Sequence, residues 1–176
     1  MSKTSLKKYI ATLDAGQLRE FILEFYSSRR EIKEYIDFYL EPDSRAKAEK
    51  YRQKIGREFI TRFGTKKRRP RGSVCKKAIT EFRRFSPDPL VLADLMLYYV
   101  ESAEAWRTSR PRYPMNDHFL ESLTATLGEA IDLIVSEGAV AQFRDRLEAI
   151  IAKTLAWGSD FHRHLAEKMP APRGGE

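Results

Sequence analysis

Apolar residues recur along most of this chain with the three- and four-residue spacing of an α-helix. Between Leu18 and Phe25, for example, four of them occupy positions i, i+3, i+4 and i+7, which places them on one face of a helix. No segment bounded by turn residues alternates apolar and polar positions as a half-buried strand does. The pattern therefore predicts an all-α fold.

Capping and turn residues divide this pattern into about eight helices. Asp14, Asp43 and Ser73 each precede a helical pattern, and we expect them to cap the second, fourth and fifth helices. Pro89 is expected at the first position of the sixth helix, where its missing amide costs nothing. The connections are short, so we expect consecutive antiparallel hairpins in an irregular array or a bundle. No fixed-period repeat of the kind found in solenoids is present in the sequence.

Two glycines shape the C-terminal part of the pattern. Gly138 is expected to end the seventh helix as its C-terminal cap. The eighth helix is expected to extend from Val140 to about Met169, with a kink or interruption at Gly158.

The segment 90–100, LVLADLMLYYV, is apolar on nearly all sides, which is typical of a central, buried helix. Only Asp94, Tyr98 and Glu101 form a narrow polar stripe along it. A chain of 176 residues can bury roughly 70% of the surface that its unfolded state exposes. We therefore expect one helical domain over residues 1–169 and a disordered tail at 170–176.

The net charge of +7 is concentrated in one part of the chain. Residues 43–84 carry sixteen Lys and Arg against four Asp and Glu, a net charge of +12, whereas the rest of the chain carries −5. A basic excess confined in this way predicts a surface of positive potential, and hence an anionic partner.

The most basic stretch consists of a loop and a short helix. We expect an irregular, mobile loop at residues 64–72, because glycine lies at both ends and Pro70 lies inside. On the helix that follows, two lysines precede two arginines by seven residues, so all four share one face. The candidate anion-binding residues are therefore Lys66, Lys67, Arg68, Arg69, Arg71, Lys76, Lys77, Arg83 and Arg84.

The sequence leaves three interpretations of this stretch open. Basic side chains beside a helix N-terminus suit phosphate groups, and thus nucleic acid of any base sequence. An acidic protein is a second kind of partner. The same charges also occur in loops that are merely solvated, and no aromatic residue that would stack on a base lies inside the stretch, since Phe63 and Phe85 only flank it.

Asp94 and Glu101 are the best candidates for catalytic carboxylates, because their seven-residue spacing places them on one helix face, with Glu104 nearby. Such a pair can perform acid–base chemistry if desolvation raises the pKa of one member. More commonly, carboxylates form the polar edge of a helix and pair with basic side chains, and Arg107 stands at i+3 from Glu104. An enzyme that uses Asp94 and Glu101 is therefore the less favoured alternative.

Histidine and cysteine give little indication of a metal or redox site. His162 and His164 are two residues apart, which places them on opposite sides of a helix, and His118 has acidic neighbours of an ordinary kind. Cys75 lies on an apolar stripe, where cysteine usually acts as a small hydrophobe, although nearby basic residues can make such a thiol reactive. A single cysteine excludes an intramolecular disulfide. We expect neither a metal nor a cofactor.

The chain resembles an uncharacterised bacterial all-α family, known only as a domain of unknown function, in the two stretches SLKKYIATLDAGQLREFILEFYSSRREIKEYIDFYLEPD and SVCKKAITEFRRFSPDPLVLADLMLYYVE. The resemblance covers the chain from Ser5 to about Leu165. It implies an all-helical fold in a bacterial cytoplasm, and it supplies no substrate, cofactor or site residue.

The N-terminal sequence MSKTSLKKYIATL lacks the apolar run of a signal peptide, and no later stretch approaches the about 20 apolar residues that span a bilayer. We therefore expect a soluble, cytoplasmic protein that does not enter a membrane. The favoured function is that of a non-enzymatic helical binding or scaffold protein whose basic face contacts nucleic acid through its phosphates. A protein–protein adaptor with a solvated basic loop is the main alternative.

Overall fold

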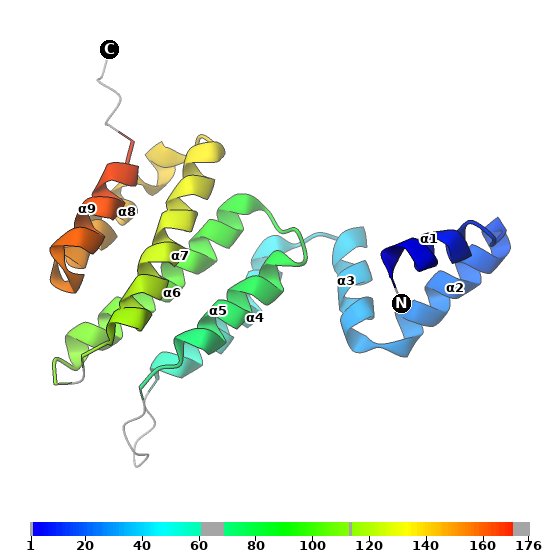
Figure 1. Ribbon diagram of the computed structural model, residues 1–176, viewed down its shortest axis with the longest axis horizontal. Helices are drawn as coiled ribbons and strands as arrows, with labels where there is room; N and C mark the ends of the chain where they lie inside the picture. Colours follow the sequence, from blue (N-terminus) through cyan, green and yellow to red (C-terminus); the bar gives the residue numbers. More distant parts are fainter. Residues whose placement is uncertain (1, 61–68, 113, 171–176) are drawn as a thin grey trace. The chain divides into compact units, whose positions relative to one another are not determined.

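The computed structural model describes residues 2–60, 69–112 and 114–170. Within these ranges all regular structure is helical, comprising nine α-helices and one short 3-10 helix, which confirms the predicted all-α fold (Figure 1). Contacts divide the chain into two compact units, Met1–Asp43 and Ser44–Glu176. The single domain predicted over residues 1–169 stays a prediction, and the tail predicted to be disordered lies, apart from Pro170, outside the described residues.

The first unit contains three helices, α1 (Lys3–Ile10), α2 (Ala15–Ser28) and α3 (Arg30–Leu40). Asp14 caps α2 as predicted, because its Oδ1 accepts a hydrogen bond from the backbone N–H of Gln17 at 2.8 Å. The Gln17 side chain accepts one from the backbone N–H of Asp14 at 3.0 Å, which completes a capping box. The Tyr26 hydroxyl of α2 donates to Asp37 of α3 at 2.8 Å and links these two helices.

The second unit contains the helices α4 (Ser44–Phe59), α5 (Gly72–Arg83), α6 (Pro89–Ser109), α7 (Asp117–Ser136), α8 (Val140–Thr154) and α9 (Ser159–Lys168). Helix α6 packs against α4, α5, α7 and α8, which confirms its predicted central position. Pro89 stands at its start as expected, and the Asp88 carboxylate caps it by accepting from the backbone N–H of Leu90 at 2.8 Å. Neighbouring helices pack antiparallel.

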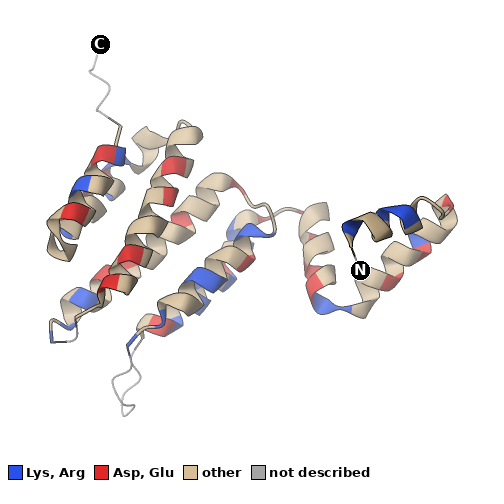
Figure 2. Ribbon diagram, in the orientation of Figure 1, with Lys and Arg blue, Asp and Glu red and all other residues tan. Residues whose placement is uncertain are grey.

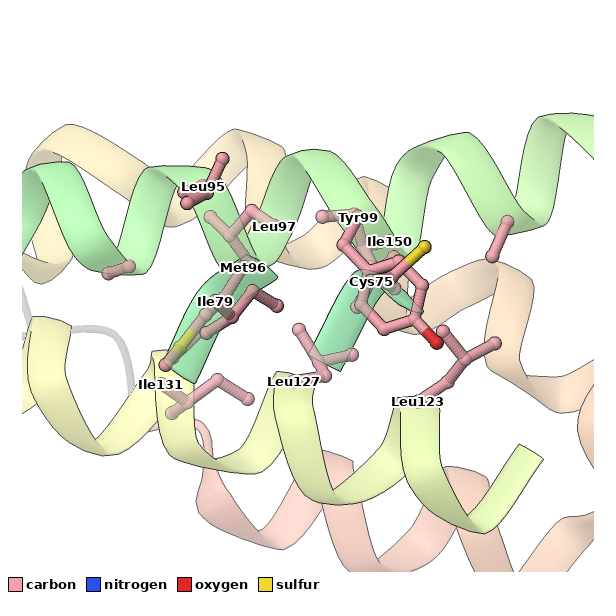
Figure 3. Packing of buried hydrophobic residues seen from close by; sticks show 14 of the residues in the cluster. Cys75, Ile79, Leu95, Met96, Leu97, Tyr99, Leu123, Leu127, Ile131 and Ile150 are labelled. Carbon is pink, nitrogen blue, oxygen red and sulfur yellow. The ribbon is translucent and has the colours of Figure 1, made fainter. Parts of the chain in front are cut away.

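The core of the second unit forms where α5, α6 and α7 meet (Figure 3). Leu95, Met96 and Tyr99 of α6 are fully buried there, together with Leu127 of α7 and Cys75 of α5. Removing one large apolar side chain from water contributes about 1.5 to 3 kcal/mol, so these layers supply most of the cohesion of the unit. The core thus holds α5 rigidly on α6, which determines which residues of α5 face outward.

The start of α5 differs from the prediction. The helix begins at Gly72, one residue before Ser73, and none of the described side chains caps it, so the prediction of Ser73 as its cap is wrong. Close packing favours glycine at this position, because a Cβ on Gly72 would lie 2.9 Å from the Phe119 ring and 3.1 Å from the Tyr99 hydroxyl oxygen. Asp43 directly precedes α4, and its role as a cap stays a prediction.

The glycines of the C-terminal part behave as expected. Gly138 has a φ of +67° and ends α7 in a Schellman arrangement, in which its N–H donates to Val135 at 3.0 Å and that of Ala139 to Ile134 at 3.0 Å. Gly158 has a φ of +135°, which L-residues rarely adopt, and it separates α9 from a 3-10 helix at Leu155–Trp157. The predicted eighth helix is therefore two helices, and α9 packs back against α7 and α8.

Candidate functional site

The outward side of α5 carries a set of basic residues that we name the α5 basic face, consisting of Lys76, Lys77, Arg83 and Arg84. All four side chains are exposed, whereas Cys75, Ala78, Ile79 and Phe82 on the opposite side of the helix are buried. The predicted register of this helix is thus confirmed. Figure 2 shows the basic segments along α5 in blue.

One member of the α5 basic face is already paired. Arg83 Nη2 lies 2.6 Å from Glu129 Oε1 of α7, an exposed ion pair of small energetic value. For Lys76, Lys77 and Arg84, in contrast, no acidic partner is found among the residues that the structure describes. These three charges are therefore available to an anion without breaking an internal ion pair.

The predicted loop cations divide into two groups. Lys66, Lys67 and Arg68 lie outside the described residues. Arg69 is exposed, and the described part of the chain offers it no ion-pair partner. Only the C-terminal end of the predicted loop at 64–72 therefore lies within the described residues, and Pro70 is buried there.

Arg71 is held by Glu58 of α4. Its Nε and Nη2 donate to the two carboxylate oxygens at 2.9 and 2.6 Å, and its backbone N–H donates to Oε2 at 3.2 Å. The hydrogen bond with Glu58 raises the pKa of Arg71. A forked pair of this kind ties the start of α5 to α4, so Arg71 positions the basic surface and its charge is largely neutralised.

Helix α4 adds cations that the sequence analysis did not include in the site. Arg45, Lys50 and Arg57 are exposed, and no partner for them occurs within the described ranges. Lys54, by contrast, lies 2.7 Å from Glu81 of α5. The spacing of Lys50 and Arg57, seven residues apart on one helix face, is the sequence signal that would have included them. Lys50 and Arg57 stand one turn before and one turn after Lys54, so they share the side of α4 that contacts α5, and the basic surface extends onto α4 there. Arg45 lies instead on the side of α4 that faces α6 and α8.

The polar stripe of α6 forms an ion-pair network with α4 and α8. Arg146 of α8 donates from Nε and Nη2 to the two oxygens of Glu101 at 2.7 and 2.8 Å, and from Nη1 to Asp94 at 2.5 Å. Arg52 of α4 donates to the other oxygen of Asp94 and lies over the Tyr98 ring, 4.8 Å from its centroid. The structure therefore brings Asp94 and Glu101 together through one guanidinium.

The electrostatics of this network oppose an acid–base role for Asp94. Burial on its own would raise the pKa of Asp94, but hydrogen bonds from Arg146 and Arg52 outweigh burial and leave the pKa below its usual value. The hydrogen bond with Glu101 raises the pKa of Arg146 in turn. Asp94 is thus a weak base and is ionised at neutral pH. General acid–base catalysis is most efficient when the pKa of the catalytic group lies near the working pH.

A cleft of about 620 Å³ lies beside the network and is lined by residues of α4, α6 and α8, among them Arg45, Arg52, Asp94, Gln142 and Arg146. Asp94 therefore lines a pocket, while Glu101 is not among the lining residues. Arginines and carboxylates are balanced in the lining, so the cleft does not select strongly for either sign of charge.

Glu104 is the third carboxylate of α6, and it is buried. Arg107 donates to both of its oxygens at 2.9 and 2.7 Å, which confirms the predicted i+3 pair, and Trp157 Nε1 donates at 2.8 Å. Burial alone would raise the pKa of Glu104, but these hydrogen bonds outweigh it and lower the pKa. The carboxylate therefore anchors the 3-10 helix onto α6.

Cys75 and the histidines carry no reactive site. Burial raises the pKa of the Cys75 thiol to about 12, so the interpretation of Cys75 as a reactive thiol is wrong. His162 Nδ1 lies 3.2 Å from both Thr154 Oγ1 and the Ile151 carbonyl oxygen, which explains the ring by local packing. No group of side chains suited to hold a metal ion occurs in the described part of the chain.

These features define an all-helical protein with a basic outer surface on α4 and α5 and with carboxylates held in ion pairs. A family model matches residues 1–166, and the chain belongs to that family, DUF6155, a family of unknown function. The match confirms the resemblance to a family of unknown function. No curated protein and no solved structure matches the chain. None of the described helices is both long enough and apolar enough to cross a membrane.

Proposed function

We propose that the protein binds nucleic acid through its phosphates, using the surface of α4 and α5. The observation that carries this proposal is the α5 basic face, where Lys76, Lys77 and Arg84 are exposed without acidic partners in the described residues. They lie on a helix that the core fixes in place, so binding does not require these backbone positions to become ordered.

The spacing along α5 suits a phosphate backbone. The lysine pair and the arginine pair are seven residues apart, about 11 Å along a helix axis. Phosphates of one strand follow each other at about 3.4 Å along the axis of a duplex, so side chains about 11 Å apart can contact separate phosphates. Each contact releases condensed counterions, which favours binding whatever the base sequence.

Among the described residues of α5, no exposed aromatic side chain is available to stack on a base. Phe85, the aromatic residue that follows α5, has the ammonium group of Lys47 4.0 Å from its ring centroid. Stacking platforms are the usual means of holding single-stranded bases. The proposal is therefore for nucleic acid of any sequence, duplex above all, with phosphate contacts supplying the affinity.

A titration of fluorescently labelled duplex with the native protein and with Lys76→Gln/Lys77→Gln tests the proposal. Loss of two phosphate contacts is expected to weaken binding at low salt at least tenfold. The matched control is Arg112→Gln/Lys153→Gln, which removes two exposed charges of the second unit outside α4 and α5 and is expected to leave binding unchanged. Equal affinity of all three proteins, or no binding by any of them, would refute the proposal.

A further inference from the structure

The first unit encloses almost no core of its own. None of the described residues of α1 and α2 is buried, and α3 buries only Phe38. Units of about 40 residues usually depend on disulfides, metals or oligomerisation for stability. The one cysteine of the chain belongs to the second unit, and the described residues contain no cluster of metal-ligating side chains. An additional apolar surface that covers this unit would therefore add to its stability.

Most of the exposed apolar side chains of the molecule belong to this unit. In the part of the chain that the structure describes, eight of the eleven exposed large hydrophobic residues are Leu6, Tyr9, Ile22, Leu23, Phe25, Tyr35, Tyr39 and Leu40. Among the described residues of the second unit, the exposed large hydrophobic residues are Ile60, Val135 and Leu155, which lie on separate segments. Among the described residues, the second unit therefore offers no apolar surface as large as that of the first unit. The first unit of another copy does offer one.

An apolar groove lies between α1 and α2 and includes Leu6, Tyr9 and Phe25 of this set. It has a volume of about 560 Å³, and its lining consists of Ser2, Lys3, Ser5, Leu6, Tyr9, Phe21 and Phe25. The rings of Tyr9 and Phe21 meet edge to face at 5.7 Å, and those of Phe21 and Phe25 at 4.7 Å, so one wall is aromatic. Leu6 and Phe25 remain 47% and 43% exposed, which leaves them accessible to a second protein.

The charges of the two helices that form the groove are largely complementary. Helix α1 carries Lys3, Lys7 and Lys8 and has no acidic residue, whereas α2 carries Glu20 and Glu24 one turn apart with a single cation, Arg19, and all six are exposed. In a two-fold dimer the same surface occurs on both chains, so α1 of each copy can lie against α2 of the other. Both pairings then bring lysines opposite glutamates, which fixes the register while the apolar side chains supply the affinity.

We propose that the α1–α2 groove is a homodimerisation surface, in which a second copy of this chain covers the exposed apolar residues of the first unit in a two-fold arrangement. This interaction is separate from the basic surface of α4 and α5.

Sedimentation velocity of the full chain over a concentration series tests the proposal. The native protein is expected to sediment as a dimer, and Leu6→Glu/Phe25→Glu as a monomer. Leu155→Glu is the matched control, because Leu155 is 63% exposed but belongs to the second unit, and this variant is expected to remain dimeric. A native protein that is monomeric at all concentrations, or a Leu155→Glu variant that dissociates equally, would overturn the proposal.

A charge exchange separates a lost interface from a lost fold. Lys3→Glu/Lys7→Glu and Glu20→Lys/Glu24→Lys, each measured alone, place like charges across the interface and are expected to weaken dimerisation at least tenfold. In an equimolar mixture each α1 faces an α2 of opposite charge, so association is expected to return. Misfolded variants would not rescue each other, and a mixture that stays monomeric would contradict the two-fold pairing.

Discussion

Arg146 is the residue that neutralises the polar stripe of α6. Its guanidinium bonds to both Asp94 and Glu101, and it thereby turns two carboxylates that would repel each other into a link between α6 and α8. The same residue lowers the pKa of Asp94 together with Arg52. At the scale of residues, the polar stripe of α6 is thus a structural network.

Replacement of Arg146 by Met is expected to reduce the free energy of unfolding by about 1 to 3 kcal/mol, because Glu101 then lacks its partner in a half-buried site and Asp94 keeps only Arg52. The loss stays below that of a fully buried pair, since the side chains of Arg146, Asp94 and Glu101 remain 29% to 37% exposed. Arg144→Met on the same helix, which removes a 3.4 Å contact with Glu148, is the control and should cost less than about 0.5 kcal/mol. Urea denaturation of the two variants measures the difference.

The lowered pKa of Asp94 predicts a pH dependence of stability. The folded protein holds this pKa below the about 3.9 of an unfolded chain, so ionised Asp94 stabilises the fold above that pH. The contribution is lost as the pH falls through the folded value. Asp94→Asn is therefore expected to destabilise the protein at pH 7, and the difference from the native protein should shrink below about pH 4. A difference in urea midpoint that does not change between pH 7 and pH 3 would contradict this explanation.

At the scale of elements, backbone conformation and close packing determine where helices begin and end. Gly158 divides the C-terminal region into α8, a 3-10 helix and α9, and it lets α9 fold back against α7. Its φ of +135° and ψ of 149° belong to a region that is essentially restricted to glycine.

Gly158→Ala is expected to lower the free energy of unfolding by about 1 to 3 kcal/mol because of backbone strain. Gly138→Ala offers a matched comparison. Its φ of +67° lies in the left-handed helical region, and a Cβ would meet nothing within 4 Å, so its expected cost is only about 1 kcal/mol. Thermal denaturation of both variants tests this order, and an equal or smaller effect at Gly158 would contradict it.

Periodicity and capping chemistry predicted most elements correctly, because these signals are local. The cap at Asp14, Pro89 at the start of α6 and the stop at Gly138 all follow from neighbouring residues. The prediction of Ser73 as the cap of α5 was wrong, and the close packing that favours glycine at position 72 involves Phe119, 47 positions further along the chain. Partners such as Arg146 for Asp94 are equally remote in sequence, so the α6 carboxylates were recognised as a set while their neutralisation was not.

At the scale of the whole molecule, the two units are assigned different tasks. The second has a large apolar core and displays exposed cations on α4 and α5, whereas the first has little core and an apolar groove. The regional charge of the sequence indicated α4 and α5, both of which lie within the basic stretch 43–84. It did not distinguish the unpaired cations from the paired ones. Arg71 and Arg83 form ion pairs with Glu58 and Glu129, whereas Lys76, Lys77 and Arg84 have no acidic partner among the described residues.

The measurement that tests nucleic-acid binding most directly is the salt dependence of duplex affinity, determined by fluorescence anisotropy for the native protein and for Lys76→Gln/Lys77→Gln. Each neutralised phosphate contributes about −0.9 to the slope of log affinity against log salt, so the variant is expected to have a slope shallower by about 2. The Arg112→Gln/Lys153→Gln control should retain the native slope. A native protein whose affinity is insensitive to salt, or a variant whose slope equals that of the native protein, would contradict the proposal that the α5 basic face holds phosphates.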